Sequence, residues 1–96
     1  MAATSQFSVT NSAATAVTTV SFCRNVRVTE NRGVVGWPTS DFLIYKPDGN
    51  ATPVRIQAGS QYTFNAPPSF FKPGQIVGYV KMVTGTTTFD QDEDQT

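Results

Sequence analysis

The sequence contains no histidine and only one cysteine among its 96 residues. Histidine is the commonest general base and the commonest ligand of transition metals, so its absence removes the usual centre of an acid–base or zinc site. A single cysteine, Cys23, cannot form an internal disulfide. Small secreted domains commonly depend on several disulfides, so we expect folding in a reducing compartment or stabilisation by assembly with other subunits.

Long apolar runs are also missing. No stretch of 18 consecutive apolar residues occurs, which excludes a transmembrane helix. The first residues, Met-Ala-Ala-Thr-Ser-Gln, have neither the basic residues nor the apolar block of a signal peptide. We therefore expect synthesis in the cytoplasm, no export by the general route and no membrane partner.

Charged residues are scarce, at 15%, and most of the acids lie at one end of the chain. Residues 1–89 carry seven basic and three acidic side chains, a net charge of +4. This balance falls short of the dense Lys/Arg stripe of a nucleic-acid binder, so we expect no nucleic-acid partner. The run from Asp90 to Asp94 is expected to be a frayed tail, with Asp92 and Asp94 available to dock on a basic neighbouring subunit.

What the sequence has in abundance is alternation of apolar and polar residues, with many β-branched side chains, which predicts strands. No segment combines helical periodicity with capping residues. The clearest turn signal, Pro47-Asp48-Gly49-Asn50, predicts a hairpin between its flanking strands. The strands are expected at residues 7–10, 14–22, 26–29, 41–46, 53–56, 61–64, 75–83 and 86–89.

This pattern predicts an all-β fold, a small antiparallel β-sandwich or barrel of about 7–8 short strands. The length is typical of a single domain, which we expect to span residues 1–96. Met1–Phe7 is expected to be a short flexible N-terminal arm, matching the acidic C-terminal tail at the other end.

Candidate catalytic groups are few. Cys23 precedes Arg24, which could favour a thiolate, but a small buried residue at the start of a strand is the preferred interpretation. Glu30 and Asp41 flank one loop and are interpreted as solvated loop acids, not as a glycosidase pair. The acidic run begins like a calcium loop but has Gln95 where glycine is required. We predict no catalytic residue, no metal site, no cofactor and no enzymatic activity.

Two long loops, 31–40 and 66–74, hold the informative aromatic residues. Trp37, near Arg32, either caps the core or anchors a protein interface. Of the adjacent residues Phe70 and Phe71, only one can point inward if the segment is extended, and the other should be exposed. The residues expected at a partner interface are Arg32, Trp37, Phe70, Phe71, Asp92 and Asp94.

Three stretches carry a resemblance to a known group of proteins. Residues 22–28 form an aromatic-Cys-Arg entry into a Val-alternating strand, and 53–64 form a strand, an Ala-Gly-Ser turn and a second strand. Gly78–Lys81 is then followed by 84–89. This order resembles small virion accessory proteins of tailed bacteriophages. The resemblance implies a β-sandwich that decorates or cements the capsid shell, with no catalytic residue to carry over.

The preferred hypothesis is thus a phage capsid decoration or cement subunit located in the virion. Its expected partners are the major capsid protein or other virion subunits, and it is expected to be a homo-oligomer on the particle. The alternative is a carbohydrate-binding or adhesive β-sandwich module of a receptor-binding fibre. In that case Trp37 with Tyr45 or Tyr62 would stack on sugar rings.

Overall fold

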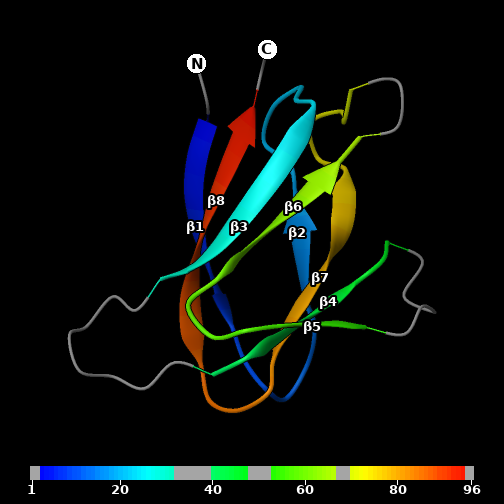
Figure 1. Ribbon diagram of the computed structural model, residues 1–96. Helices are drawn as coiled ribbons and strands as arrows, with labels where there is room; N and C mark the ends of the chain where they lie inside the picture. Colours follow the sequence, from blue (N-terminus) through cyan, green and yellow to red (C-terminus); the bar gives the residue numbers. More distant parts are fainter. Residues whose placement is uncertain (1–2, 32–39, 48–52, 67–69, 95–96) are drawn as a thin grey trace.

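The computed structural model describes residues 3–31, 40–47, 53–66 and 70–94, and this part of the chain is built of strands without any helix (Figure 1). None of it forms a helix that could cross a membrane. The prediction of an all-β fold is confirmed. The eight strands are β1 (Ala3–Val9), β2 (Thr15–Thr18), β3 (Asn25–Asn31), β4 (Phe42–Tyr45), β5 (Val54–Ile56), β6 (Gln61–Asn65), β7 (Ile76–Met82) and β8 (Thr87–Asp94).

The strands form two antiparallel sheets of four. The first sheet has the order β1-β8-β3-β6 and the second has the order β2-β7-β4-β5. The predicted hairpin is present, because β4 pairs with β5 in a register that places Phe42 opposite Ile56. Residues 48–50 of the predicted turn lie outside the described residues. The two sheets pack face to face, which confirms the predicted small β-sandwich (Figure 1).

One hydrophobic core fills the space between the sheets. Phe42 from the second sheet meets Phe89 from the first edge to face, with ring centroids 4.9 Å apart and planes at 88°. Phe7 of β1 stacks on the same Phe89 at 5.8 Å. Aromatic pairs of this kind add to the free energy gained by burial alone. The buried hydrophobic residues are Val9, Val17, Cys23, Val26, Val28, Phe42, Ile44, Phe64, Phe71, Val77, Val80, Met82 and Phe89.

The first sheet contains β1, which begins at Ala3, and β8, which ends at Asp94, so a flexible arm over Met1–Phe7 and a frayed tail over Asp90–Asp94 are wrong for the described residues. β1 pairs with β8 from Ala3↔Glu93 to Val9↔Thr87. β8 lies between β1 and β3 and is therefore a central strand. The acidic run can occupy this place because alternate side chains of a strand point to opposite faces. Phe89, Gln91 and Glu93 are buried, whereas Asp90, Asp92 and Asp94 are only partly buried.

Candidate functional site

Glu93 is the most deeply buried acidic side chain of the described chain, with 1% of its surface exposed. Its carboxylate accepts hydrogen bonds from the backbone N–H groups of Val20 and Ser21 at 2.9 and 3.0 Å. It also accepts the Ser21 hydroxyl at 2.6 Å and the Gln91 amide at 2.7 Å. Both oxygens are occupied, so the carboxylate holds the segment after β2 against β8.

Cys23 lies beside this network and has no exposed surface. Burial, together with the negative charge of Glu93 and a hydrogen bond to it, raises the pKa of the Cys23 thiol to about 11. The thiolate is the nucleophilic and metal-binding form of cysteine, and at neutral pH this side chain is protonated. The interpretation of Cys23 as a small buried residue is confirmed.

Glu30 and Asp41 converge on one turn. Glu30 accepts the backbone N–H of Gly59 at 2.6 Å, and Asp41 accepts that of Ala58 at 2.9 Å. Asp41 also pairs with the Arg55 guanidinium at 2.9 Å. The hydrogen bond from Arg55, with that from Ala58, lowers the pKa of the Asp41 carboxyl. A carboxyl held ionised in this way is a poor general acid.

The expectation of a solvated Glu30 is wrong, because only 5% of this residue is exposed. Its Oε1 receives the Gly59 N–H, while its Oε2 is buried without a hydrogen-bond partner. The sequence placed Glu30 at the edge of a loop, but β3 extends through Asn31 and carries the side chain inward. Within the described ranges, no three histidine, cysteine or acidic residues are grouped so as to hold a metal ion.

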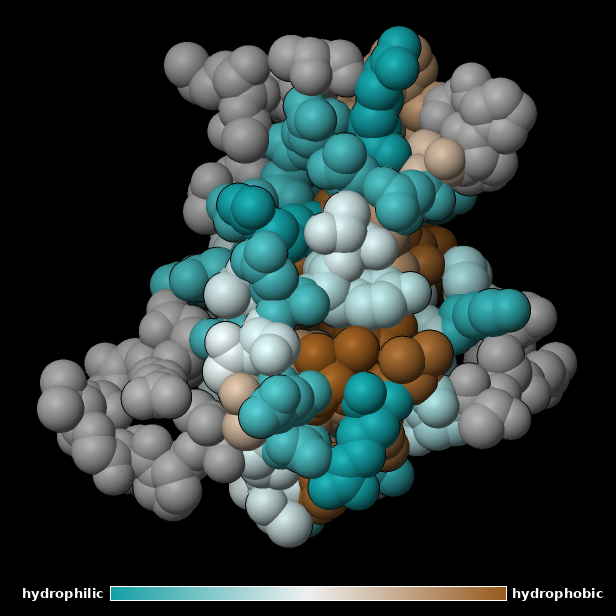
Figure 2. Space-filling model, in the orientation of Figure 1, coloured by the Kyte–Doolittle hydropathy of each residue, from teal (hydrophilic) through white to brown (hydrophobic). Residues whose placement is uncertain are grey.

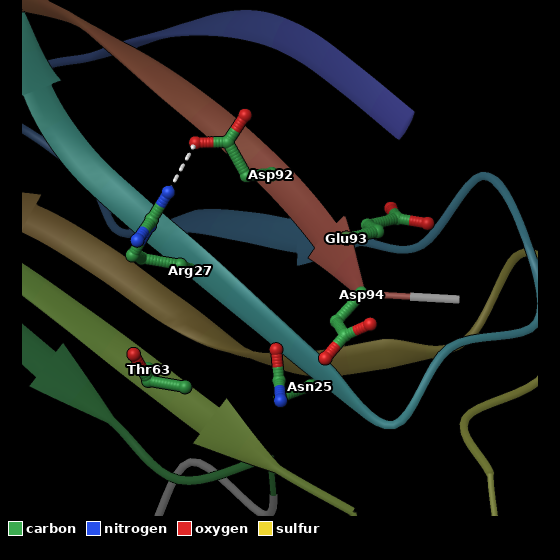
Figure 3. A pocket seen from close by; sticks show the side chains of 6 residues that line it. All are labelled: Asn25, Arg27, Thr63, Asp92, Glu93 and Asp94. Carbon is green, nitrogen blue, oxygen red and sulfur yellow. Dashed lines mark hydrogen bonds and ion pairs between the residues drawn. The ribbon is translucent and has the colours of Figure 1, made fainter. Parts of the chain in front are cut away.

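The outer face of the first sheet carries a polar hollow of roughly 300 Å³. Arg27 of β3 reaches Asp92 of β8 in an ion pair of 3.3 Å across directly paired residues (Figure 3). The neighbouring pair Asn25↔Asp94 lies at the end of the same two strands (Figure 3). The hollow offers hydrogen-bond donors and acceptors but no aromatic ring. The residues that line it are Asn25, Arg27, Thr63, Asp92, Glu93 and Asp94.

Most of the large exposed hydrophobic side chains of the described residues belong to segments 20–22 and 70–76. Figure 1 shows these segments at the end of the sandwich where β1 begins and β8 ends. Here Cys23 and Phe71 form an isolated antiparallel bridge, with N···O distances of 3.2 and 2.8 Å. We call residues 22–24 and 70–72 the end ribbon. Because Cys23 and Phe71 face the core, their neighbours on both strands face outward.

The outward face of the end ribbon combines aromatic rings with cations. The bridge register places Phe22 opposite Lys72 and Arg24 opposite Phe70. Phe22 is 62% exposed and Phe70 is 46% exposed. The Arg24 guanidinium lies 5.1 Å from the centre of the Phe70 ring, within cation–π range. Aromatic rings and arginine are enriched at protein interfaces, and this face carries two such rings and Arg24.

A second apolar surface opens between the sheets, on the side formed by β6, β4 and β5. Figure 2 shows hydrophobic side chains gathered there. The groove has a volume of about 510 Å³, and Tyr45 and Tyr62 both contribute to it. Lys46, Asn65 and Gln75 add polar groups. The groove thus brings together two of the aromatic residues that the sequence suggested for sugar stacking.

The predicted interface residues have different outcomes. Phe70 is exposed, but Phe71 is 7% exposed and belongs to the core, so its assignment as an interface anchor is wrong. Both facts agree with the expectation that only one of the two rings can point inward. Arg32 and Trp37 lie outside the described residues. Asp92 and Asp94 lie on β8 and line the polar hollow, so neither belongs to a frayed tail.

Sequence reasoning missed Phe22, which has the largest exposed fraction of the large hydrophobic residues described. It was assigned to the end of a predicted strand, where alternation would have buried it or its neighbour. The only available signal was its position next to Cys23, because the two residues must face opposite sides of an extended segment. The partner segment 70–72 is distant in sequence, so the pairing that forms the end ribbon could not be predicted.

Comparison with known protein families finds none that matches the chain, and comparison with curated proteins likewise finds no match.

Proposed function

We propose that this chain is a non-enzymatic virion structural protein, a decoration or cement subunit that binds the capsid shell of a tailed bacteriophage. The observation that carries the proposal is the outward face of the end ribbon. It displays Phe22 and Phe70 to solvent beside Arg24 and Lys72. Its partner would be the major capsid protein or another virion subunit.

Interface energetics supports this use of the end ribbon. Exposed aromatic and arginine side chains are the residues that most often contribute the largest share of binding energy. Of the five large hydrophobic residues exposed in the described ranges, four lie in the adjoining segments 20–22 and 70–76: Val20, Phe22, Phe70 and Ile76. The nearby cations add complementarity to an acidic partner surface and oppose binding to a basic one.

The state of the buried polar groups also favours binding over catalysis. The Glu93 carboxylate and the Asp41 carboxylate are both engaged in hydrogen bonds that hold backbone segments. The Cys23 thiol has a raised pKa and no exposed surface. These groups stabilise the fold, whereas the outward-facing side chains of the end ribbon lie in solvent and make no comparable contribution to the core.

Substitution of the exposed aromatic rings tests the proposal. We expect Phe22→Ser and Phe70→Ser each to weaken binding to capsid shells lacking this protein by roughly tenfold or more, as for interface anchors. Binding is measured by co-sedimentation with the shells. The matched control is Val54→Ser, which removes a 49% exposed side chain from β5, outside the end ribbon. Shell binding that falls equally in all three variants, or in none, would contradict the proposal.

The groove beside β6 supports a second candidate, a carbohydrate-binding or adhesive module. Tyr45 and Tyr62 both line it, together with the amide side chains of Asn65 and Gln75. Aromatic rings bind the apolar faces of sugars, and amides bind hydroxyl groups. This candidate gains support if the purified chain binds a glycan array while the end-ribbon variants leave shell binding unchanged.

A further inference from the structure

β1 forms an open edge of the first sheet. It is the end strand of that sheet and pairs with β8 along seven residues, from Ala3 to Val9. Among the described residues, no strand pairs with its other side, and Figure 1 shows it at the margin of the sheet. The backbone N–H and C=O groups on that side are thus available to a further strand.

The other three edge strands are shorter than β1. β5 has three residues and includes Arg55, and β2 has four with a register shift between Val17 and Thr18. β6 has five residues. Natural sheets protect their edges with short strands, bulges, prolines and charged side chains. β1 has seven residues in unbroken register, with no glycine, proline or charged residue.

The sequence of β1 is suited to pairing with itself. Full antiparallel overlap of residues 3–9 places Gln6 opposite Gln6 of the second copy. The same register places Phe7 opposite Ser5, and Val9 opposite Ala3, so each large apolar residue is opposite a small one. No charged residue meets a like charge. Phe7 is only partly buried on Phe89, and a neighbouring strand would cover it further.

We propose that two copies of this chain associate through antiparallel β1–β1 pairing centred on Gln6, which joins two first sheets into one eight-stranded sheet. The inference does not rest on the proposed function, because the end ribbon is formed by other segments. Antiparallel pairing turns the copies end for end, so the two end ribbons lie at opposite ends of the dimer. A seven-residue contact is small beside the ~1,600 Å² of a standard interface, so the dimer should dissociate on dilution.

Light scattering and cysteine crosslinking test the pairing. The mass should rise with concentration from 10.4 kDa toward twice that value. Under mild oxidation, Gln6→Cys should crosslink roughly tenfold or more faster than Ser8→Cys, because only the central residue faces itself. In this register two Ser8 positions lie about 13 Å apart along the strands, beyond the reach of a disulfide. Wild-type Cys23, which is buried, provides the background rate.

A charge substitution provides the second measurement. Gln6→Lys should weaken dimerisation roughly tenfold or more, because it places like charges opposite each other. The new lysine can pair with Asp90, which Gln6 contacts at 2.8 Å, so the monomer should remain folded by circular dichroism. Phe22→Ser should leave the dimer intact. A monomeric mass at millimolar concentration, or equal crosslinking at positions 6 and 8, would overturn the proposal.

Discussion

At the scale of single residues, Gly78 shows how closely the two sheets approach each other. A Cβ atom at this position would lie 2.5 Å from the Phe64 ring and 2.8 Å from the Tyr45 carbonyl oxygen. The ring belongs to the first sheet, whereas the carbonyl belongs to β4, which pairs with β7 next to Gly78. Glycine is therefore required here because no room is left for a side chain where the two sheets meet.

We expect Gly78→Ala to lower the free energy of unfolding by about 1–3 kcal/mol, the usual cost of an overpacked core. Urea denaturation measures the loss. Combining it with Phe64→Leu should cost less than the two single changes added together, since the smaller side chain leaves room for the methyl group. Strict additivity of the two changes would show that the ring is not the obstacle.

At the scale of elements, β8 differs most from its expected role. A segment with four acids is a central strand because its sheet neighbours bond its backbone on both sides. Its two faces carry carboxylates in different environments. Glu93 is buried with four donors, and Asp92 faces outward toward Arg27. The difference between these environments should be visible in stability.

We expect Glu93→Ala to destabilise the protein by about 3–5 kcal/mol, because buried donors are left without an acceptor. Asp92→Ala, the matched control one position away, should cost less than about 1 kcal/mol, as exposed ion pairs do. Thermal and urea unfolding compare the two variants. Similar losses for both would mean that the strand does not distinguish its faces as described.

At the scale of the whole molecule, Cys23 reports whether the sandwich is closed. It is the only cysteine, it has no exposed surface and its bridge to Phe71 joins the two segments of the end ribbon. A reagent reaches the thiol only when these segments separate or the core opens. The labelling rate therefore measures opening of the fold.

We expect labelling of Cys23 by a disulfide reagent at pH 8 to be slow in native protein and to rise with urea together with unfolding. The raised thiol pKa acts in the same direction, because the folded state keeps the proton. This raised pKa stabilises the folded state relative to the unfolded state. The stabilisation is complete at pH values below the ordinary thiol pKa of 9.0, and it is lost as the pH rises through about 11. Labelling in native buffer as fast as in denaturant would contradict a closed core.

At this scale the proposed shell binding and the proposed dimerisation are compatible, because they use different surfaces. The end ribbon and the β1 edge are separate surfaces, one rich in aromatic rings and cations, the other presenting backbone groups. A dimer paired through β1 would carry an end ribbon at each end. Such a subunit could contact two neighbouring sites on a particle, which would raise its apparent affinity through multivalency.

The sequence by itself determined the all-β class, the approximate positions of most strands and the inward position of one ring of the Phe70-Phe71 pair. These features depend on local alternation and turn residues, which act over a few positions. The tertiary structure alone decided that Phe71 is the inward ring, that Glu93 and Glu30 are buried, and that β8 is central. Each of these depends on which distant segments pair, because burial and hydrogen-bond partners come from residues far away in the chain.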